Sequence, residues 1–250
     1  RNRSDPKDFH CTVGGVDVTN IDFALKSSVR NIPSPGQMLF SAVTDSLPDS
    51  GNTGAWAQYL PPGGPAYATL GGNPTVARFG GVKWVRNYRV GTSTGFRVMG
   101  PITAIPCNGV TIVTAVRPIY VSPGGEQRGE LVDFMYDRLA LALAHTDGRI
   151  MVARNGNWGT FGPALPQNQA TILSLVVQPD GSYRVYTNGV QAMTGAASTP
   201  NFSTNMVPIG SQSFKQYVNL GRNDPDGWSA YEGYLGDVFV YTNALGNVER

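Results

Sequence analysis

Residues 233–241 read GYLGDVFVY, and this stretch decides the fold. The side chains of a β-strand alternate between two faces, so the stretch is predicted to be a strand with two distinct sides. One face is predicted to carry Leu235, Asp237, Phe239 and Tyr241, and the other Gly236, Val238 and Val240. Apolar side chains on both faces indicate a strand that is covered on both sides, as at the centre of a β-sandwich.

The composition of the whole chain favours the same fold class. Charged residues make up only 14% of the 250 residues, whereas the chain contains 31 glycines and 18 prolines. Low charge with many turn-forming residues is typical of all-β sandwiches and barrels. The net charge of +2 is too small to indicate a nucleic-acid partner. No apolar run approaches the ~18 residues of a membrane-spanning helix, so we expect no membrane-spanning segment.

Three turn signals predict consecutive hairpins in the second half of the chain. They are residues 145–148 (HTDG), 179–181 (PDG) and 187–189 (TNG), each flanked by apolar runs. The Asn-Gly pair of the third signal suits the positive φ angles of a type I′ turn. His145 opens the first of these turns and is expected to be solvated.

Three motifs carry a family resemblance, and they occur in a characteristic order. Residues 109–118 (GVTIVTAVRP) fit the pattern G-x-T-I-x-x-x-V-x-P, residues 182–190 (SYRVYTNGV) fit x-x-x-x-Y-x-N-G-V, and residues 233–250 begin with the GYLGDVFVY strand. Together they resemble the laminin-G-like, concanavalin A-like domains of secreted bacterial proteins. The resemblance implies an all-β fold, a two-sheet antiparallel jelly-roll sandwich, and a protein that is secreted or displayed on the cell surface.

The chain is predicted to divide into an N-terminal arm, residues 1–14, and one sandwich domain, residues 15–250, because Gly14 and Gly15 interrupt the polar start. Cys11 lies in the arm and Cys107 in the domain. The two cysteines are predicted either to form one disulfide or to remain buried free thiols.

Calcium is the metal that the resemblance implies. Asp237 occupies the position of the family's calcium-binding Asp, and a buried carboxylate needs a partner that a hard cation can supply. The alternative is a carboxylate that is exposed or bonded to a backbone N–H or to an arginine. Oxygen ligands at Asn223, Asp224 and Asp226 form a second candidate site, although the same residues are also typical of a tight turn alone.

Exposed aromatic rings are the candidate ligand-binding residues. Trp158, Trp228 and Tyr231, together with Asn157, are predicted to contact a glycan, because sugar rings stack on aromatic faces. The alternative is that these rings cap the core of a glycine-rich sandwich, as large aromatic side chains commonly do.

The residues that enzymes of this fold use are not matched. Glu130 and Asp133 are an odd number of residues apart, so a regular strand places them on opposite faces. Asp133 and Asp137 share a face but lie about 13 Å apart, beyond the ~5–9.5 Å of a glycosidase carboxylate pair. His10 and His145 lie in no lyase motif. We therefore expect no catalytic residues.

The predicted function is a non-catalytic extracellular recognition or adhesion module that binds a glycan or a protein partner. The alternative is a structural subunit of an extracellular assembly, which self-associates when the arm pairs with a strand of a neighbouring copy. A polysaccharide lyase or a glycosidase is the third possibility.

Overall fold

The computed structural model divides the chain into two compact units, residues 1–31 and 32–250. It describes residues 11–13, 16–18, 38–42, 44, 47, 51–52, 67–71, 74–89, 94–98, 109–120, 128–134, 139–154, 156–158, 161–197, 218–222 and 229–246. In the first unit, β1 (Cys11–Val13) pairs antiparallel with β2 (Val16–Val18). The predicted division into an arm, residues 1–14, and a domain, residues 15–250, stays a prediction.

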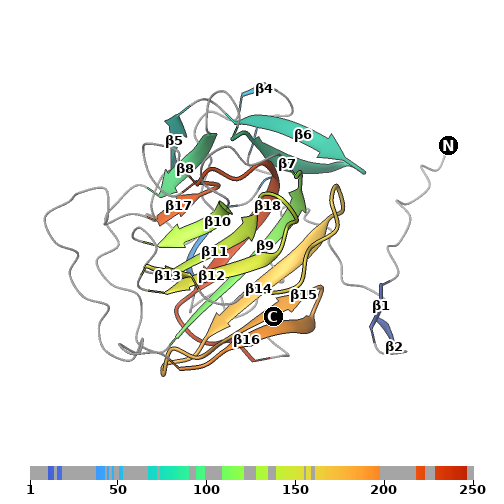
Figure 1. The fold of residues 1–250 in the computed structure, drawn as a ribbon. Helices are drawn as coiled ribbons and strands as arrows, with labels where there is room; N and C mark the ends of the chain where they lie inside the picture. Colours follow the sequence, from blue (N-terminus) through green and yellow to red (C-terminus); the bar gives the residue numbers. More distant parts are fainter. Residues whose placement is uncertain are drawn as a thin grey trace, which may run out of the picture. The chain divides into compact units, whose positions relative to one another are not determined.

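The second unit is a sandwich of two antiparallel β-sheets, which confirms the predicted jelly-roll fold class (Figure 1). The nine-stranded sheet runs β16-β15-β14-β9-β18-β7-β6-β4, and β3 also pairs with β18. Its strands are β3 (Met38–Ala42), β4 (Gly51–Asn52), β6 (Thr75–Phe79), β7 (Val82–Asn87), β9 (Val110–Pro118), β14 (Thr171–Val177), β15 (Tyr183–Thr187), β16 (Val190–Gly195) and β18 (Gly233–Tyr241).

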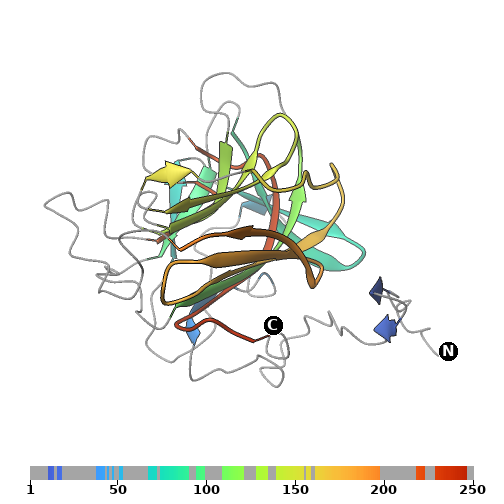
Figure 2. The same ribbon diagram turned by 60° about the horizontal axis from the view of Figure 1, so that its bottom comes forward.

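The seven-stranded sheet runs β13-β12-β11-β10-β17-β8-β5. Its strands are β5 (Tyr67–Gly71), β8 (Thr94–Val98), β10 (Arg128–Phe134), β11 (Leu139–Ala144), β12 (Ile150–Arg154), β13 (Asn157–Trp158) and β17 (Val218–Leu220). β18, red in Figure 2, belongs to the nine-stranded sheet, where it lies between β9 and β7. In the described part of the chain, no helix is long and apolar enough to cross a membrane.

Leucine, valine and phenylalanine side chains from both sheets fill one continuous core. Phe40 of β3 and Phe134 of β10 meet there with ring centroids 6.3 Å apart, and both side chains are buried. Each sheet contributes the apolar face of its strands to this core. That face is removed from water only because the other sheet packs against it.

The three predicted hairpins are confirmed. They join β11 to β12, β14 to β15, and β15 to β16. In the third turn, Asn188 has a φ of 49° and Gly189 a φ of 81°, the two positive angles that a type I′ turn requires.

β18 spans Gly233–Tyr241, the residues predicted for it, but it is not a regular strand. Its register against β9 slips between Leu235 and Val238, which pair with Val116 and Thr114. Three residue steps along β18 therefore match two steps along β9, which defines a β-bulge.

The bulge reverses the alternation of faces along β18. Leu235 lies in the main core together with Val238 and Val240, whereas Phe239 and Tyr241 pack in a separate cluster. The prediction that Leu235 shares a face with Phe239 and Tyr241 is therefore wrong, because period-two alternation holds only in an unbulged strand.

The bulge also marks a change of partner on one edge of β18. The part before it, Gly233 to Leu235, pairs with β7, and the part after it, Val238 to Tyr241, pairs with β3. Gly236 lies in the bulge, and a Cβ atom there would meet the Ala115 Cβ at 2.8 Å and a ring carbon of Trp84 at 3.3 Å.

The chain after β18 is held by β9. The backbone N–H of Leu245 donates to the Thr111 hydroxyl at 2.9 Å, and the Leu245 side chain packs against Tyr241.

His145 differs from its expected solvated position. It is 3% exposed, and a Cβ atom on the facing Gly129 would lie 2.7 Å from its ring. The pKa of His145 is lowered to about 4, chiefly by burial and in addition by the positive charge of Arg89, while a hydrogen bond with the Arg128 backbone acts in the opposite direction. The imidazole is therefore neutral in the folded protein at pH 7.

Replacing Gly236 by Ala should destabilise the fold by about 1–3 kcal/mol, because the added methyl overpacks the contact with Ala115. Chemical denaturation of the wild type and Gly236→Ala measures this. Gly80→Asn is the control, since its turn position is open and Asn tolerates a positive φ. Equal stability of Gly236→Ala and wild type would contradict the close packing of the bulge.

Acidification should destabilise the protein through His145. The unfolded chain binds a proton near pH 6.5 and the folded chain only near pH 4, so stability falls as the pH drops through this window. The loss at pH 4 is about 3 kcal/mol, and this group contributes no pH dependence above about pH 7.

The check for His145 is a set of denaturation curves between pH 4 and 8 for the wild type and His145→Gln. The variant carries no titrating group at this position, so its stability should depend less on pH in that window. Identical pH slopes for the two proteins would refute the assignment to His145.

Candidate functional site

The outer face of the seven-stranded sheet carries small side chains on β11. This strand reads LALALA, and its leucines lie in the core. Alternation therefore places its alanines on the opposite face. Ala142 and Ala144 pack there with Met151 of β12 and Trp158 of β13.

Cross-strand pairing extends this outer face into a row over five strands (Figure 1). The row runs from Trp158 through Ala153, Ala140 and Asp133 to Asn219. An aromatic ring at one end and a polar side chain at the other thus lie on one line, with alanines between them.

β10 carries a second bulge, which corrects the predicted arrangement of its carboxylates. Glu130 pairs with Ala142 and Asp133 with Ala140, so three residue steps along β10 match two steps along β11. Because Ala142 and Ala140 share the outer face, Glu130 and Asp133 share it too. The prediction of opposite faces is wrong, since the extra residue, Leu131, points into the core.

Both carboxylates are fully buried, at 0% exposure, although they lie on the outer face. The Arg128 Nε lies 3.4 Å from the Glu130 Oε1, which gives this carboxylate a cationic neighbour. Buried carboxylates need such partners, because transfer of an unpaired charge out of water is costly.

Trp158 and Arg128 form the accessible end of this face. The Arg128 guanidinium lies 4.3 Å from the centroid of the Trp158 ring, within the range of a cation–π contact. Both side chains are half-buried, and the neighbouring Asn157 is exposed. The structure therefore brings together the two predicted residues Trp158 and Asn157 and adds Arg128 to them.

Tyr231 lies apart from this group. Its side chain is 1% exposed and belongs to the main core, so it offers no ring face to a sugar. Burial raises the pKa of its hydroxyl well above the ordinary value. This differs from its predicted role as a surface aromatic and agrees with the alternative that such rings fill the core.

Asp237 lies in the bulge of β18, where a calcium ion is predicted. Its Oδ1 accepts hydrogen bonds from the backbone N–H and the hydroxyl of Thr44, both at 2.7 Å. These partners are donors, so this oxygen is satisfied without a cation. Within the described residues, no cluster of three acidic, histidine or cysteine side chains could hold a metal. Calcium at Asp237 stays a prediction.

Other predicted site residues lie outside the described residues. These are Asn223, Asp224, Asp226, Trp228 and Cys107. Cys11 begins β1, and its disulfide stays a prediction.

Sequence reasoning missed Arg128 and Asn219 as members of this face. The Arg128-x-Glu130 spacing could have revealed the first, because alternate residues of a strand share a face. No local pattern could have revealed Asn219, which meets Asp133 only through the pairing of β17 with β10.

Comparisons with known proteins show the fold. No family model and no curated protein matches the chain. Domain 4 of AbnA, a GH43 extracellular arabinanase from Geobacillus stearothermophilus, aligns over 81% of this chain and 97% of that domain, with a TM-score of 0.55 at 17% identity.

Two larger proteins contain a similar unit. Trypanosoma rangeli sialidase aligns over 87% of this chain, with a TM-score of 0.56 at 14% identity, and a point mutant of HCR/D over 88%, with a TM-score of 0.54 at 8% identity. The chain spans only 32% of the sialidase and 51% of HCR/D. What the chain shares with these structures is the all-β, two-sheet sandwich.

Proposed function

We propose that the protein is a glycan-recognition module and that Trp158 and Arg128 form its contact surface. The supporting observation is their stacked pair at 4.3 Å beside the exposed Asn157. An aromatic ring offers an apolar surface to the C–H face of a sugar, while a guanidinium and an amide offer hydrogen bonds to its hydroxyl groups. The extracellular location implied by the resemblance remains part of this proposal.

Recognition without catalysis is supported by the burial of the two carboxylates. Glu130 and Asp133 are 0% exposed, so a scissile bond has no access to them in this conformation. The arabinanase domain with the similar fold is described in complex with arabinotriose, which makes this neutral oligosaccharide the first probe to use. Assembly through the arm and a protein partner stay predictions.

Trp158→Ala should weaken the binding of arabinotriose, or of the neutral oligosaccharide that a glycan array selects, by at least about tenfold, or about 1.4 kcal/mol. Titration calorimetry measures the affinities. Phe161→Ala is the matched control, because Phe161 is 50% exposed and carries Arg149 over its ring at 4.4 Å. Equal losses in both variants, or no binding of any neutral glycan by the wild type, would overturn the proposal.

A glycosidase is the second candidate function, and the bulge of β10 favours it. The partners of Glu130 and Asp133 are two residues apart on β11, so the Cα atoms lie about 7 Å apart along the strand. This spacing is compatible with the ~5–9.5 Å between the carboxyl groups of glycosidases. Catalysis further requires that the buried side chains of Glu130 and Asp133 become accessible to a substrate.

If the protein is a glycosidase, Glu130→Gln and Asp133→Asn should each reduce the release of reducing ends by about 100-fold or more, because each removes an acid or base group. The control is Asp147→Asn, since Asp147 lies in a turn with its side chain 41% exposed and pairs with Arg149. An inactive wild-type protein on a panel of neutral polysaccharides would eliminate this candidate and leave recognition.

A further inference from the structure

A second group of aromatic and cationic side chains lies on the outer face of the nine-stranded sheet. Tyr234 of β18 pairs with Arg86 of β7 on one side and with Arg117 of β9 on the other. Directly opposed residues share a face, so the two guanidinium groups flank one tyrosine. The neighbouring Leu235 and Val116 lie in the core, which identifies the Tyr234 face as the outer one.

Ring contacts fix this group in place. The rings of Phe79 and Tyr234 meet edge to face, with centroids 4.7 Å apart and planes at 84°. The Arg117 guanidinium lies 3.9 Å from the Phe79 centroid and 5.6 Å from that of Tyr234. Arg86 lies 5.2 Å from Tyr234 on the other side. All four side chains are half-buried, so each retains solvent access.

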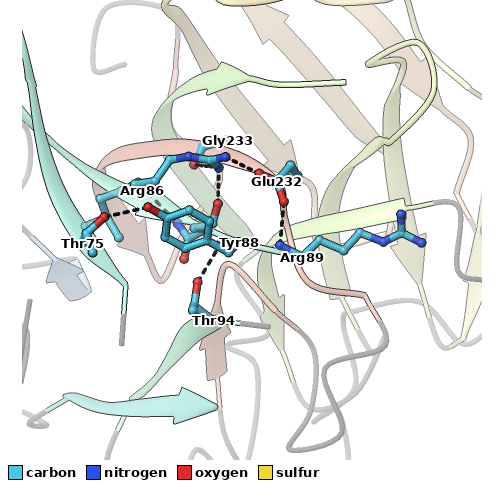
Figure 3. A network of polar contacts seen from close by, with 9 residues as sticks. Thr75, Arg86, Tyr88, Arg89, Thr94, Glu232 and Gly233 are labelled. Atoms are coloured by element: carbon cyan, nitrogen blue, oxygen red, sulfur yellow. Dashed lines mark hydrogen bonds and ion pairs between the residues drawn. The ribbon is translucent and has the colours of Figure 1, made fainter. Parts of the chain in front are cut away.

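The two arginines differ in how their charge is compensated. Arg86 pairs with the carboxylate of Glu232 and donates to the Gly233 carbonyl at 3.2 Å (Figure 3). The second carboxylate oxygen of Glu232 accepts from the Arg89 backbone N–H at 2.7 Å. The charge of Arg86 is therefore neutralised inside a closed network.

Among the residues that the structure describes, Arg117 has no such acidic partner. Its Nε donates to the Asn168 carbonyl at 2.7 Å, and this bond and the two ring contacts orient the guanidinium. Within the described residues, no carboxylate lies within ion-pair distance of Arg117 and its two Nη groups make no hydrogen bond. The Arg117 guanidinium is therefore a fixed, planar cation that lies beside two aromatic rings and forms no ion pair with a described residue.

We propose that Arg117 is the anchor of a second binding site, which takes the carboxylate of an acidic sugar residue such as a uronic acid. The Nη groups present two parallel donors, the arrangement that matches the two oxygens of a carboxylate. Phe79 and Tyr234 supply apolar ring surface beside it for the sugar. The inference rests on the proposed glycan recognition for its ligand class, but it uses the opposite face of the sandwich from Trp158.

The test compares trigalacturonate with its methyl ester, which keeps the sugar and removes the charge. Wild type should bind the acid at least tenfold more tightly than the ester. Arg117→Gln should remove this difference through a 10- to 100-fold loss for the acid, because a charge-assisted bidentate contact is lost. Arg117→Lys should bind with intermediate affinity, since lysine keeps the charge but not the planar fork.

Arg184→Gln is the matched control. Arg184 is exposed on β15 of the same sheet. Its replacement by Gln removes one positive charge, as Arg117→Gln does, but at a position without the aromatic contacts of Arg117. It should bind trigalacturonate like the wild type, and thermal unfolding should show that every variant is folded. Unchanged acid binding in folded Arg117→Gln, or an equal loss in Arg184→Gln, would overturn the assignment of the site to Arg117.

Two further measurements test this inference separately from the proposed function and distinguish acidic sugars from other carboxylate ligands. Trp158→Ala should leave the acid-over-ester preference intact; failure of Trp158→Ala to weaken neutral glycans would then remove the proposed function alone. A triaspartate peptide should bind at least tenfold more weakly than trigalacturonate. Equal binding of the peptide would make this a general carboxylate site and overturn the assignment to sugars.

Discussion

The hydrogen bonding of β18 on both edges is the constraint on which the sandwich depends. One edge pairs with β9 along its length, and the other pairs first with β7 and then with β3. The bulge lies between these two paired segments, at the point where the partner on this edge changes. The bulge also turns Asp237 toward Thr44, just after β3, so a buried carboxylate reinforces the point where the partner changes.

A polar network ties this arrangement to the other sheet. Tyr88, just after β7, and Thr94, the first residue of β8, bond each other reciprocally through the Tyr88 backbone and the Thr94 backbone and hydroxyl. Figure 3 shows these residues next to Arg86 and Glu232, which connect the end of β7 to the start of β18. The corner between the two sheets is therefore cross-linked by partly buried polar groups, and leaving a buried member of such a network unsatisfied would be costly.

The fold could be predicted from the sequence because its signals are local. The GYLGDVFVY strand and the three hairpins follow from period-two alternation and turn chemistry, and both appear at the predicted residues. The site could be predicted only in part. Bulges arise from cross-strand pairing, so the shared face of Glu130 and Asp133 was invisible to a rule based on spacing. The burial of His145 likewise depends on Gly129 of a neighbouring strand.

The bulge of β10 has an evolutionary meaning. Leu131 is one residue more than the register with β11 requires, and the residues on both sides keep their faces. One residue can therefore be inserted into or deleted from this strand while the neighbouring side chains keep their positions on the core face or the outer face. Strand length in the sequence and strand length in the sheet can then drift apart between lineages.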